Sequence, residues 1–537
     1  MFKINKYRSP RIFVLVGFFL MILTICAYAS DSIIFNYGID TELSTLEPAN
    51  FTNVTDFIVV FNLYDPLVYP TMESGKIVKP WIAKSWDISK DAKTYTFYLN
   101  KGIKFHDGSE VTAEDVAFSM DRMMTIGGRT SNNFASIIKS GNTEVIDKYT
   151  VVFHLEKPSA SLLANLLNFF ILNKNLLLQN KREGQYGEYG DYGKAYLETH
   201  DVGSGPYKLN VIKYAELITF DKFKDYWKKW EENSIDEVRI KIIPEEVTRA
   251  TMLQDGILDM ADWCMDPTRY DVLEKVPGII VNRALNTSNW FLILNNQKPP
   301  FDDIYVRKAV AYAVDYDAIS KNITRGKQAI GPLPINMTGH SNDVIVYYQD
   351  YKKAKEMLQK SKYSPEELAK FQLIYKSVVP SARLSNIALS VMDSLDKIGL
   401  NVKIENTTWT DLCYITSQPN PDVNMTSFYS TGLIPDPFTF LVYFTKSYWN
   451  SAYPPGMMFY ENPEVTKLIN EARKTIEIEK QLALYVKAQK LITEDCPVIF
   501  LSNDGYFMPF RDYVKGYEYP VGAGYYDLRF DNLRIEK

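Results

Sequence analysis

The chain has 537 residues, of which 46% are hydrophobic and 23% are charged. This balance is typical of a globular protein and excludes a disordered chain, a coiled-coil rod and a polytopic membrane protein. Lys and Arg total 60 against 65 Asp and Glu, so the formal net charge is −5. The clustered basic surface of a nucleic-acid-binding protein is therefore not expected.

The first 29 residues are typical of a secretory signal peptide. Four basic residues stand within the first eleven positions, an apolar run covers 12–25, and the small residues Ala27 and Ala29 follow. The run is short for a membrane span, so we expect cleavage after Ala29 and a free periplasmic protein. Lipid anchoring at Cys26 is the less favoured alternative, because the bulky Ile25 precedes it.

Strand and helix signals then alternate along the chain. Apolar and alternating runs predict strands over 33–39, 94–99, 151–155, 238–242 and 400–404. Helical spacing predicts helices over 57–63, 306–314 and 385–398. Thr112 with Asp115, and Asn462 with Pro463, are typical helix starts. The two kinds of element mix without a strict βα rhythm, which favours an α/β fold with discontinuous lobes.

Signatures of catalysis and metal binding are missing from the sequence. There are four His, none paired at the spacing that places two ligands on one helix face, and no nucleophile elbow or P-loop occurs. We therefore expect no enzyme, no cofactor and no metal site. Cys264, Cys413 and Cys496 are far apart in sequence. Free thiols are the default expectation for them, and one disulfide remains open in an oxidising compartment.

Seven short motifs, in order, resemble one family, the family-5 (peptide/nickel) solute-binding proteins of bacterial ABC importers. They are T-L-E-P-A at 45–49, Y-D-P-L-V at 64–68, W-I-A-K-S-W at 81–86, the run 91–108, T-A-E-D-V at 112–116, V-G-S-G-P-Y at 202–207 and the run 300–309. Each motif alone is weak, but their order and spacing over nearly the whole mature chain are specific.

The resemblance implies an α/β fold of the periplasmic-binding-protein type, with three lobes and hinge closure over the ligand. The expected segments are 30–60, 203–288 and 504–537 for lobe I, 61–202 for lobe II, and 289–503 for lobe III. It further implies a monomeric receptor that captures a peptide-class solute between lobes I and III. The receptor would deliver that solute to a permease in the inner membrane.

The resemblance also indicates where a peptide would be anchored. In peptide-binding members an Asp three residues before an Asp-Pro pair takes the α-ammonium, but Leu433 stands three residues before Asp436 here. Asp436 itself could still contribute. In dipeptide receptors an Arg takes the carboxylate, seven residues before the Arg of a P-x-A-R run. Lys376 stands seven residues before Arg383, and it keeps the charge but not the bidentate fork. A solvated strand residue is the alternative for Lys376.

Three ligand classes stay open: a peptide, an oligosaccharide and a chelated metal such as nickel. The missing Asp favours a non-peptide ligand, and aromatic rings could stack on sugar faces. The rings considered are Trp290, Trp409, Tyr429 and Trp449. The expected ligand-binding set is Lys376, Trp409, Tyr429, Leu433, Asp436 and Trp290. An interaction module without a small ligand is the other class of function.

Overall fold

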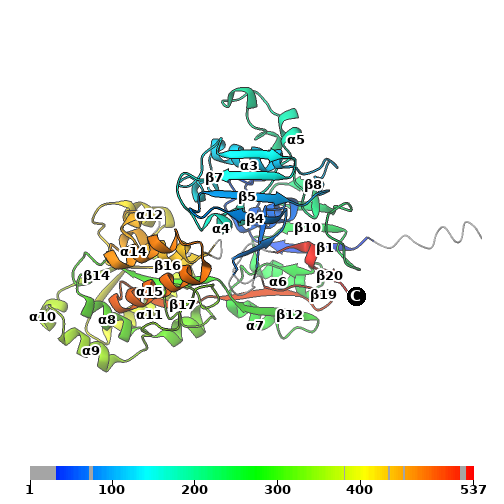
Figure 1. Ribbon diagram of the computed structural model, residues 1–537. Helices are drawn as coiled ribbons and strands as arrows, with labels where there is room; N and C mark the ends of the chain where they lie inside the picture. Colours follow the sequence, from blue (N-terminus) through cyan, green and yellow to red (C-terminus); the bar gives the residue numbers. More distant parts are fainter. Residues whose placement is uncertain (1–31, 72–75, 380, 433–435, 452–453, 520–527) are drawn as a thin grey trace, which may run out of the picture.

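The computed structural model describes residues 32–71, 76–379, 381–432, 436–451, 454–519 and 528–537. The expected signal peptide, Cys26 and Leu433 lie outside these ranges. The described chain forms two bodies connected by narrow strand crossings, and the blue, cyan and green body carries both lobes I and II (Figure 1). No helix in the described ranges is apolar over a length sufficient to span a membrane.

Lobe I is built on a sheet whose strands come from distant parts of the chain. In spatial order its strands are β12 (Ile279–Leu285), β18 (Gly505–Arg511), β11 (Met260–Ala261), β1 (Ile34–Ile39), β10 (Glu237–Ile242), β9 (Leu217–Lys222) and β8 (Tyr207–Lys213). β1 runs parallel to both of its neighbours, and the remaining pairs are antiparallel. Further elements of lobe I are α2 (Val54–Leu63), α6 (Glu246–Gln254), α7 (Pro267–Leu273), β19 (Val514–Lys515) and β20 (Arg534–Ile535).

Lobe II carries a smaller antiparallel sheet. Its strands are β4 (Ala83–Ile88), β5 (Thr94–Leu99), β7 (Thr150–His154) and β6 (Thr143–Asp147), beside the ribbon β2 (Val68–Pro70) and β3 (Val78–Pro80). Its helices include α3 (Ala113–Ile126), α4 (Leu162–Asn165) and α5 (Lys174–Gln179). In β5 every second side chain is buried, because successive residues of a strand point to opposite faces.

Lobe III has helices on both faces of its sheet. The strands in spatial order are β15 (Asn401–Thr407), β14 (Gln372–Val378), β16 (Met425–Thr431), β13 (Ser288–Leu294) and β17 (Val498–Ser502). All seven residues of β13 are buried, with Trp290 and Leu292 in one core cluster and Phe291 and Ile293 in another. A strand covered on both faces carries a continuous apolar run, here from Trp290 to Leu294, unlike the alternating β5.

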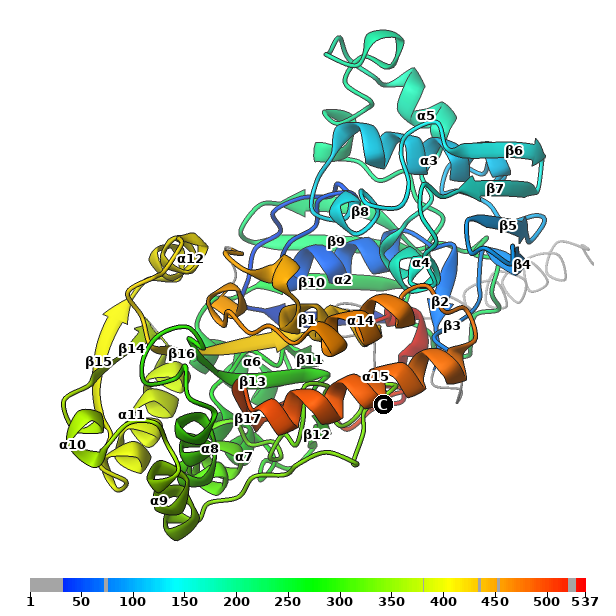
Figure 2. The same ribbon diagram turned by 60° about the vertical axis from the view of Figure 1, so that its left-hand side comes forward.

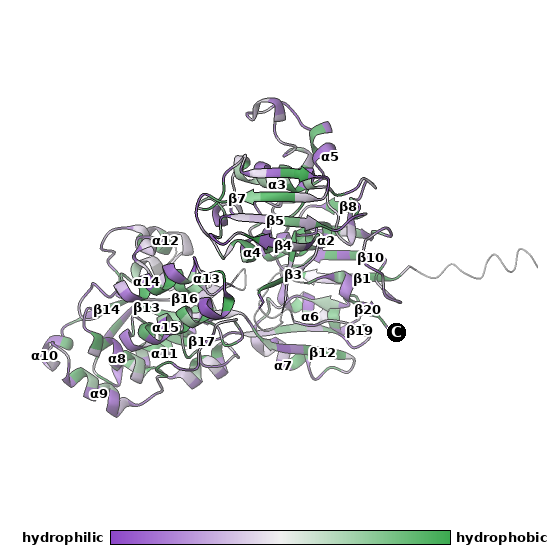
Figure 3. Cartoon of the chain, in the orientation of Figure 1, coloured by the Kyte–Doolittle hydropathy of each residue, from purple (hydrophilic) through white to green (hydrophobic). Residues whose placement is uncertain are grey.

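The helices of lobe III lie in the sequence between β13 and β17. They are α8 (Ile304–Ala313), α9 (Tyr351–Gln359), α10 (Pro365–Leu368), α11 (Ala382–Asp396), α12 (Trp409–Ser417), α13 (Phe438–Leu441), α14 (Pro463–Ala472) and α15 (Ile478–Asp495). The hydropathy colouring separates the apolar interior strands from the polar outer helix α9, of which Ala354 is the buried residue (Figure 3).

Lobes I and III are joined where two strand pairs cross between them. β12 continues into β13 through Asn286 and Thr287, and β17 continues into β18 through Asn503 and Asp504. The Asn286 amide donates to the Asp504 carbonyl at 2.9 Å, so the two crossings lie side by side. Short paired crossings of this kind form a hinge, since few residues must change conformation for the lobes to move.

Most of the expected elements are confirmed. The strand expected over 33–39 is β1, and the helix expected over 57–63 is α2, which begins three residues earlier because Asn53 caps it. Thr112 and Asp115 form the expected capping box at the start of α3. The mixed α/β composition that the sequence predicts is also confirmed.

Candidate functional site

Cavities are found where lobe III meets the other two lobes. Among the described residues, three cavities of about 450, 470 and 490 Å³ take lining residues from lobe III and from another lobe. We name them the hinge cavity, the central cavity and the outer cavity. Each is within the size range of small-molecule sites, and sites of this kind favour the boundary between domains.

The hinge cavity, of about 450 Å³, lies between the start of α2 and the sheet of lobe III. Trp290 on β13 and Tyr429 on β16 are partners in the strand register, and their ring centroids are 4.8 Å apart. Thr52, Asn53 and Trp263 contribute the wall from lobe I. A ligand here would touch both lobes at once.

A charged pair also lines the hinge cavity. Arg383, on the first turn of α11, donates from Nη1 to Oδ2 of Asp504 at 3.0 Å. The Asp504 side chain is 4% exposed and that of Arg383 is 31% exposed. Burial raises the pKa of Asp504 to about 6, although the Arg383 guanidinium opposes this shift. The guanidinium is the more exposed member of the pair and is therefore the charged group that the cavity presents.

The central cavity, of about 470 Å³, lies between lobes II and III and meets the hinge cavity at Tyr429, which lines both. Asp436 lines it and is 3% exposed, with Oδ1 accepting from the Phe438 amide at 2.9 Å. Burial raises the pKa of Asp436, while the nearby Ser161 hydroxyl and Arg473 guanidinium oppose the rise.

No ion pair to Asp436 is found among the described residues. A buried carboxylate in this position attracts a cation.

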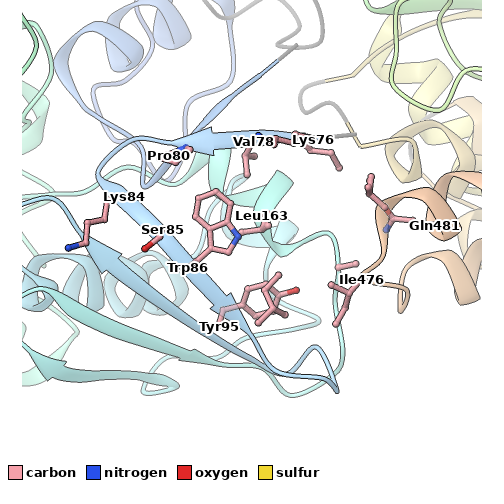
Figure 4. Close-up of a pocket in the computed structure, with 14 residues that line it drawn as sticks. Lys76, Val78, Pro80, Lys84, Ser85, Trp86, Tyr95, Leu163, Ile476 and Gln481 are labelled. Atoms are coloured by element: carbon pink, nitrogen blue, oxygen red, sulfur yellow. The ribbon is translucent and has the colours of Figure 1, made fainter. Parts of the chain in front are cut away.

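The outer cavity, of about 490 Å³, is mostly apolar. Figure 4 shows Trp86, Tyr95 and Leu163 of lobe II facing Ile476 and Gln481 of lobe III. Figure 2 shows α14 and the start of α15 beside α4 and β3.

The Ala160 amide of lobe II donates to the Arg473 carbonyl of lobe III at 3.1 Å. Ala160 lines the outer cavity and Arg473 lines the central cavity, so this hydrogen bond lies between the two cavities. The hinge and central cavities, which share Tyr429 and are lined by the expected residues Trp290 and Asp436, are the candidate ligand site.

The structure brings some of the expected site residues together and separates others. Trp290, Tyr429 and Asp436 line the hinge and central cavities. Lys376 lines none of the three cavities, and its amine is 2.7 Å from Glu405. Leu433 lies outside the described residues.

Two expected aromatic residues also lie away from the cavity linings. Trp409 is 44% exposed and stacks on Phe428, which itself lines the central cavity. Trp449 donates its indole N–H to the Tyr460 carbonyl at 3.0 Å and packs inside lobe III. The full ligand-binding set therefore stays a prediction.

Two residues of the hinge cavity were not expected at the ligand site from the sequence. Arg383 served there only to mark the P-x-A-R run, and Asp504 merely follows an apolar strand. They are 121 positions apart and meet only because the hinge crossing passes the start of α11. For Arg383 the motif itself was a usable signal, whereas nothing local singled out Asp504.

One cluster in lobe I has the composition of a metal site. Asp40, Asp262 and Cys264 offer ligand atoms that lie within 4.8 Å of one another. Nε of Arg249 is 3.0 Å from Oδ1 of Asp262, and both side chains are almost fully buried. Burial raises the pKa of Asp262 to about 7, against the effect of Arg249. The guanidinium already supplies the positive charge, so we interpret this cluster as a buried ion pair.

The described cysteines, Cys264, Cys413 and Cys496, are free thiols. The disulfide that the sequence left open among them is not formed. Cys496 is buried and the other two are half-buried. The default expectation of free thiols is confirmed for these three.

Two bodies joined by paired strand crossings, with cavities between them, define a hinged binding protein. The model of the bacterial extracellular solute-binding proteins, family 5, matches residues 78–452. The chain belongs to this family, as its motifs predict.

Similar proteins cover almost the whole chain. A probable D,D-dipeptide-binding periplasmic protein of Escherichia coli is 28% identical over 91% of this chain and 92% of its own length. The dipeptide-binding protein of the same organism is 28% identical over 88% of this chain and 89% of its own length. A solved structure of an ABC transporter-associated periplasmic binding protein from Helicobacter pylori, in complex with the peptide STSA, has a TM-score of 0.72. It is 28% identical and covers 94% of this chain and 98% of its own.

Proposed function

We propose that this protein is a periplasmic receptor that captures a peptide between its lobes and delivers it to an ABC permease in the inner membrane. The names of the similar dipeptide-binding proteins and the peptide bound to the Helicobacter pylori structure support this proposal. The receptor acts as a monomer and catalyses no reaction. The segments 30–60, 203–288 and 504–537 form lobe I, 61–202 form lobe II and 289–503 form lobe III, in keeping with how the three main sheets divide the chain.

One observation carries the peptide assignment: the hinge and central cavities meet at Tyr429, and Arg383 lines the first while Asp436 lines the second, together with Arg129 and Arg473. Arg383 presents a guanidinium in one cavity, and Asp436 is a buried carboxylate in the other. A free peptide is a zwitterion in which both ends need a partner once they leave water. Asp436 takes the α-ammonium in this proposal, in place of the Asp that the family has at the position of Leu433.

The same receptor role for a non-peptide ligand is the second candidate. The family's ammonium-binding Asp is replaced by Leu433, which favours an oligosaccharide or a chelated metal such as nickel. Tyr429, Tyr443 and Tyr448 line the central cavity, and their rings suit stacking on a sugar. Arg383 and Asp436 favour the peptide, because a neutral sugar has no charged ends to pair with them.

Native mass spectrometry of the mature chain, expressed from Ser30, tests the proposal directly. We expect a series of peptide masses that co-purify with the protein and are lost on unfolding. Adding a tripeptide pool to the stripped protein should raise its Tm and compact it in solution scattering, because a ligand that binds only the folded, closed form stabilises it. A single non-peptide mass, with no response to peptides, would overturn the peptide assignment in favour of the second candidate.

A further inference from the structure

We propose that Arg383, held in place by Asp504 at the hinge, is the anchor for the carboxylate end of the ligand, and that Lys376 is not. This inference rests on the proposed function as a peptide receptor. It gives the bound peptide a direction, with its carboxylate in the hinge cavity and its ammonium in the central cavity. It also places ligand recognition on the crossing that moves when the lobes close.

Arg383 has unused donors that the cavity can employ. A guanidinium carries five N–H groups. Within the described part of the chain, the hydrogen bond from Nη1 to Asp504 at 3.0 Å is the one that Arg383 makes. Its side chain is 31% exposed and lines the hinge cavity. A carboxylate can therefore approach the planar fork with two parallel hydrogen bonds, a geometry that lysine does not offer.

Lys376 is already paired within lobe III. Its amine is 2.7 Å from Glu405, which is also 2.8 Å from the amine of Lys403. The hydrogen bond from Lys376, followed by that from Lys403, lowers the pKa of Glu405 to about 2. Glu405 is thus ionised at neutral pH and holds the Lys376 amine beside its own sheet, and Lys376 lines none of the three cavities.

Asp504 acts on the ligand through Arg383 and is a positioning residue. Its buried carboxylate holds the guanidinium at the cavity wall, and its backbone carbonyl accepts from Asn286 on the other crossing. When ionised, Asp504 also competes with the ligand for the positive charge of Arg383. Protonation of Asp504 removes this competition, so binding of an anion at Arg383 and proton uptake at Asp504 are linked.

Tyr519, Cys264 and Asp266 lie near the pair and do not change charge between pH 5 and 8. Burial raises the pKa of Tyr519 to about 12 and that of the Cys264 thiol well above its usual range. The Thr268 hydroxyl lowers the pKa of Asp266 below its usual range. Asp504, with a pKa of about 6, titrates in this interval. Asp262, which lies beside Cys264 and pairs with Arg249, has a pKa of about 7 and titrates there too, and Asp504→Asn separates the two contributions.

Binding of three forms of Ala-Ala-Ala to the stripped mature protein tests the inference: the free acid, the C-terminal amide and the N-acetylated acid. The wild type should prefer the free acid to the amide by about tenfold or more, the scale of a charge-assisted pair. Arg383→Gln should lose this preference, and Arg383→Lys should keep part of it. Lys376→Gln should keep the preference in full, and Lys403→Gln, which removes the other amine beside Glu405, is the matched control. The thermal unfolding of each variant establishes that it is folded.

The pH dependence gives a second readout that a merely structural Asp504 would not produce. A bound carboxylate raises the pKa of Asp504. The N-acetylated acid should therefore bind more tightly at pH 5 than at pH 8, by roughly tenfold for each unit of that rise in pKa. Asp504→Asn should bind it more tightly at pH 8 and flatten the dependence.

Distinct outcomes overturn the inference and the proposed function. Equal binding of acid and amide by the wild type overturns the inference and leaves the peptide receptor standing. Loss of preference in Lys376→Gln but not in Arg383→Gln overturns it in favour of Lys376. If Asp504→Asn loses the free acid but keeps the N-acetylated acid, Asp504 binds the ammonium and the direction is reversed. If no member of a tripeptide pool binds the wild type, the proposed function itself fails.

Discussion

Trp290 and Tyr429 stand opposite one another on β13 and β16, with ring centroids 4.8 Å apart, at the place where the hinge and central cavities meet. Trp290 is 5% exposed and belongs to the core of lobe III. Tyr429 lines both cavities, and its hydroxyl accepts from the Asn286 amide group at 3.1 Å. The pair therefore connects the core of lobe III, the hinge and the candidate ligand site.

Replacing Tyr429 tests whether the two cavities act as one site. Tyr429→Ala should weaken binding of a tripeptide pool by roughly 10- to 30-fold, as expected for an aromatic residue at the centre of a contact surface. Tyr429→Phe keeps the ring and loses the bond to Asn286, so it should bind within about threefold of the wild type. Isothermal titration measures both. Unchanged affinity in Tyr429→Ala would place the ligand elsewhere.

Asp436→Asn tests the ammonium anchor. The amide still accepts from the Phe438 backbone but carries no charge, so tripeptides with a free N-terminus should bind at least about tenfold more weakly. N-acetylated tripeptides should be unaffected. Asp411→Asn is the matched control, because Asp411 also stands at a helix start and accepts from Thr408 at 2.8 Å but lines none of the three cavities. An equal loss for both kinds of peptide would make Asp436 a structural residue.

Glu47 and Arg122 form a bidentate ion pair that explains the acidic residue of the T-L-E-P-A motif. Their atoms meet at 2.6 and 2.8 Å, and the Arg122 side chain is fully buried. Glu47→Gln removes the charge but not the volume, and it should lower the free energy of unfolding by about 3–5 kcal/mol, because it leaves a buried cation unpaired. Urea denaturation measures the loss.

The matched control for this prediction is an exposed ion pair. Lys139 and Glu156 are 2.8 Å apart, with side chains 68% and 40% exposed. Glu156→Gln should leave the free energy of unfolding almost unchanged, because water and salt screen the pair. If both substitutions lowered the free energy of unfolding equally, the burial of Arg122 would not determine the size of the loss.

The stability of the ligand-free protein should fall as pH rises from 5 to 8. Burial raises the pKa of Asp262 to about 7 and that of Asp504 to about 6, above the value of about 3.9 for an unfolded Asp. Between these values the folded state binds more protons than the unfolded state, so the free energy of unfolding decreases with pH.

Asp504→Asn removes one of these two groups. It should flatten the fall by about 1.4 kcal/mol, since the pKa of Asp504 lies roughly one pH unit above the lower end of this range, and each tenfold difference in proton affinity between the folded and unfolded states corresponds to about 1.4 kcal/mol. Differential scanning fluorimetry across this range gives the profile. A Tm that rises steadily towards pH 8 would contradict the prediction.

Local sequence determined much of the fold, because caps, alternation and helical spacing act over a few residues. Thr112 and Asp115 start α3, and Asn462 caps α14 with Pro463 at its first turn, as their residue types predict. The motifs were sufficient to predict the family, since each one reports a local turn or contact that recurs in order. Trp290, Tyr429 and Asp436 were also expected at the ligand site and line its cavities.

The choice between Lys376 and Arg383 was decided only by the tertiary structure. Lys376 is directly opposite Glu405 in the register of β14 and β15, and no local pattern specifies the register of two strands 29 positions apart. Arg383 meets Asp504 because the hinge crossing returns from lobe III beside the start of α11. Lys376 and Arg383 are both cations in the sequence, but the fold gives them different surroundings. Lys376 pairs with Glu405 of its own sheet, whereas Arg383 faces the hinge cavity.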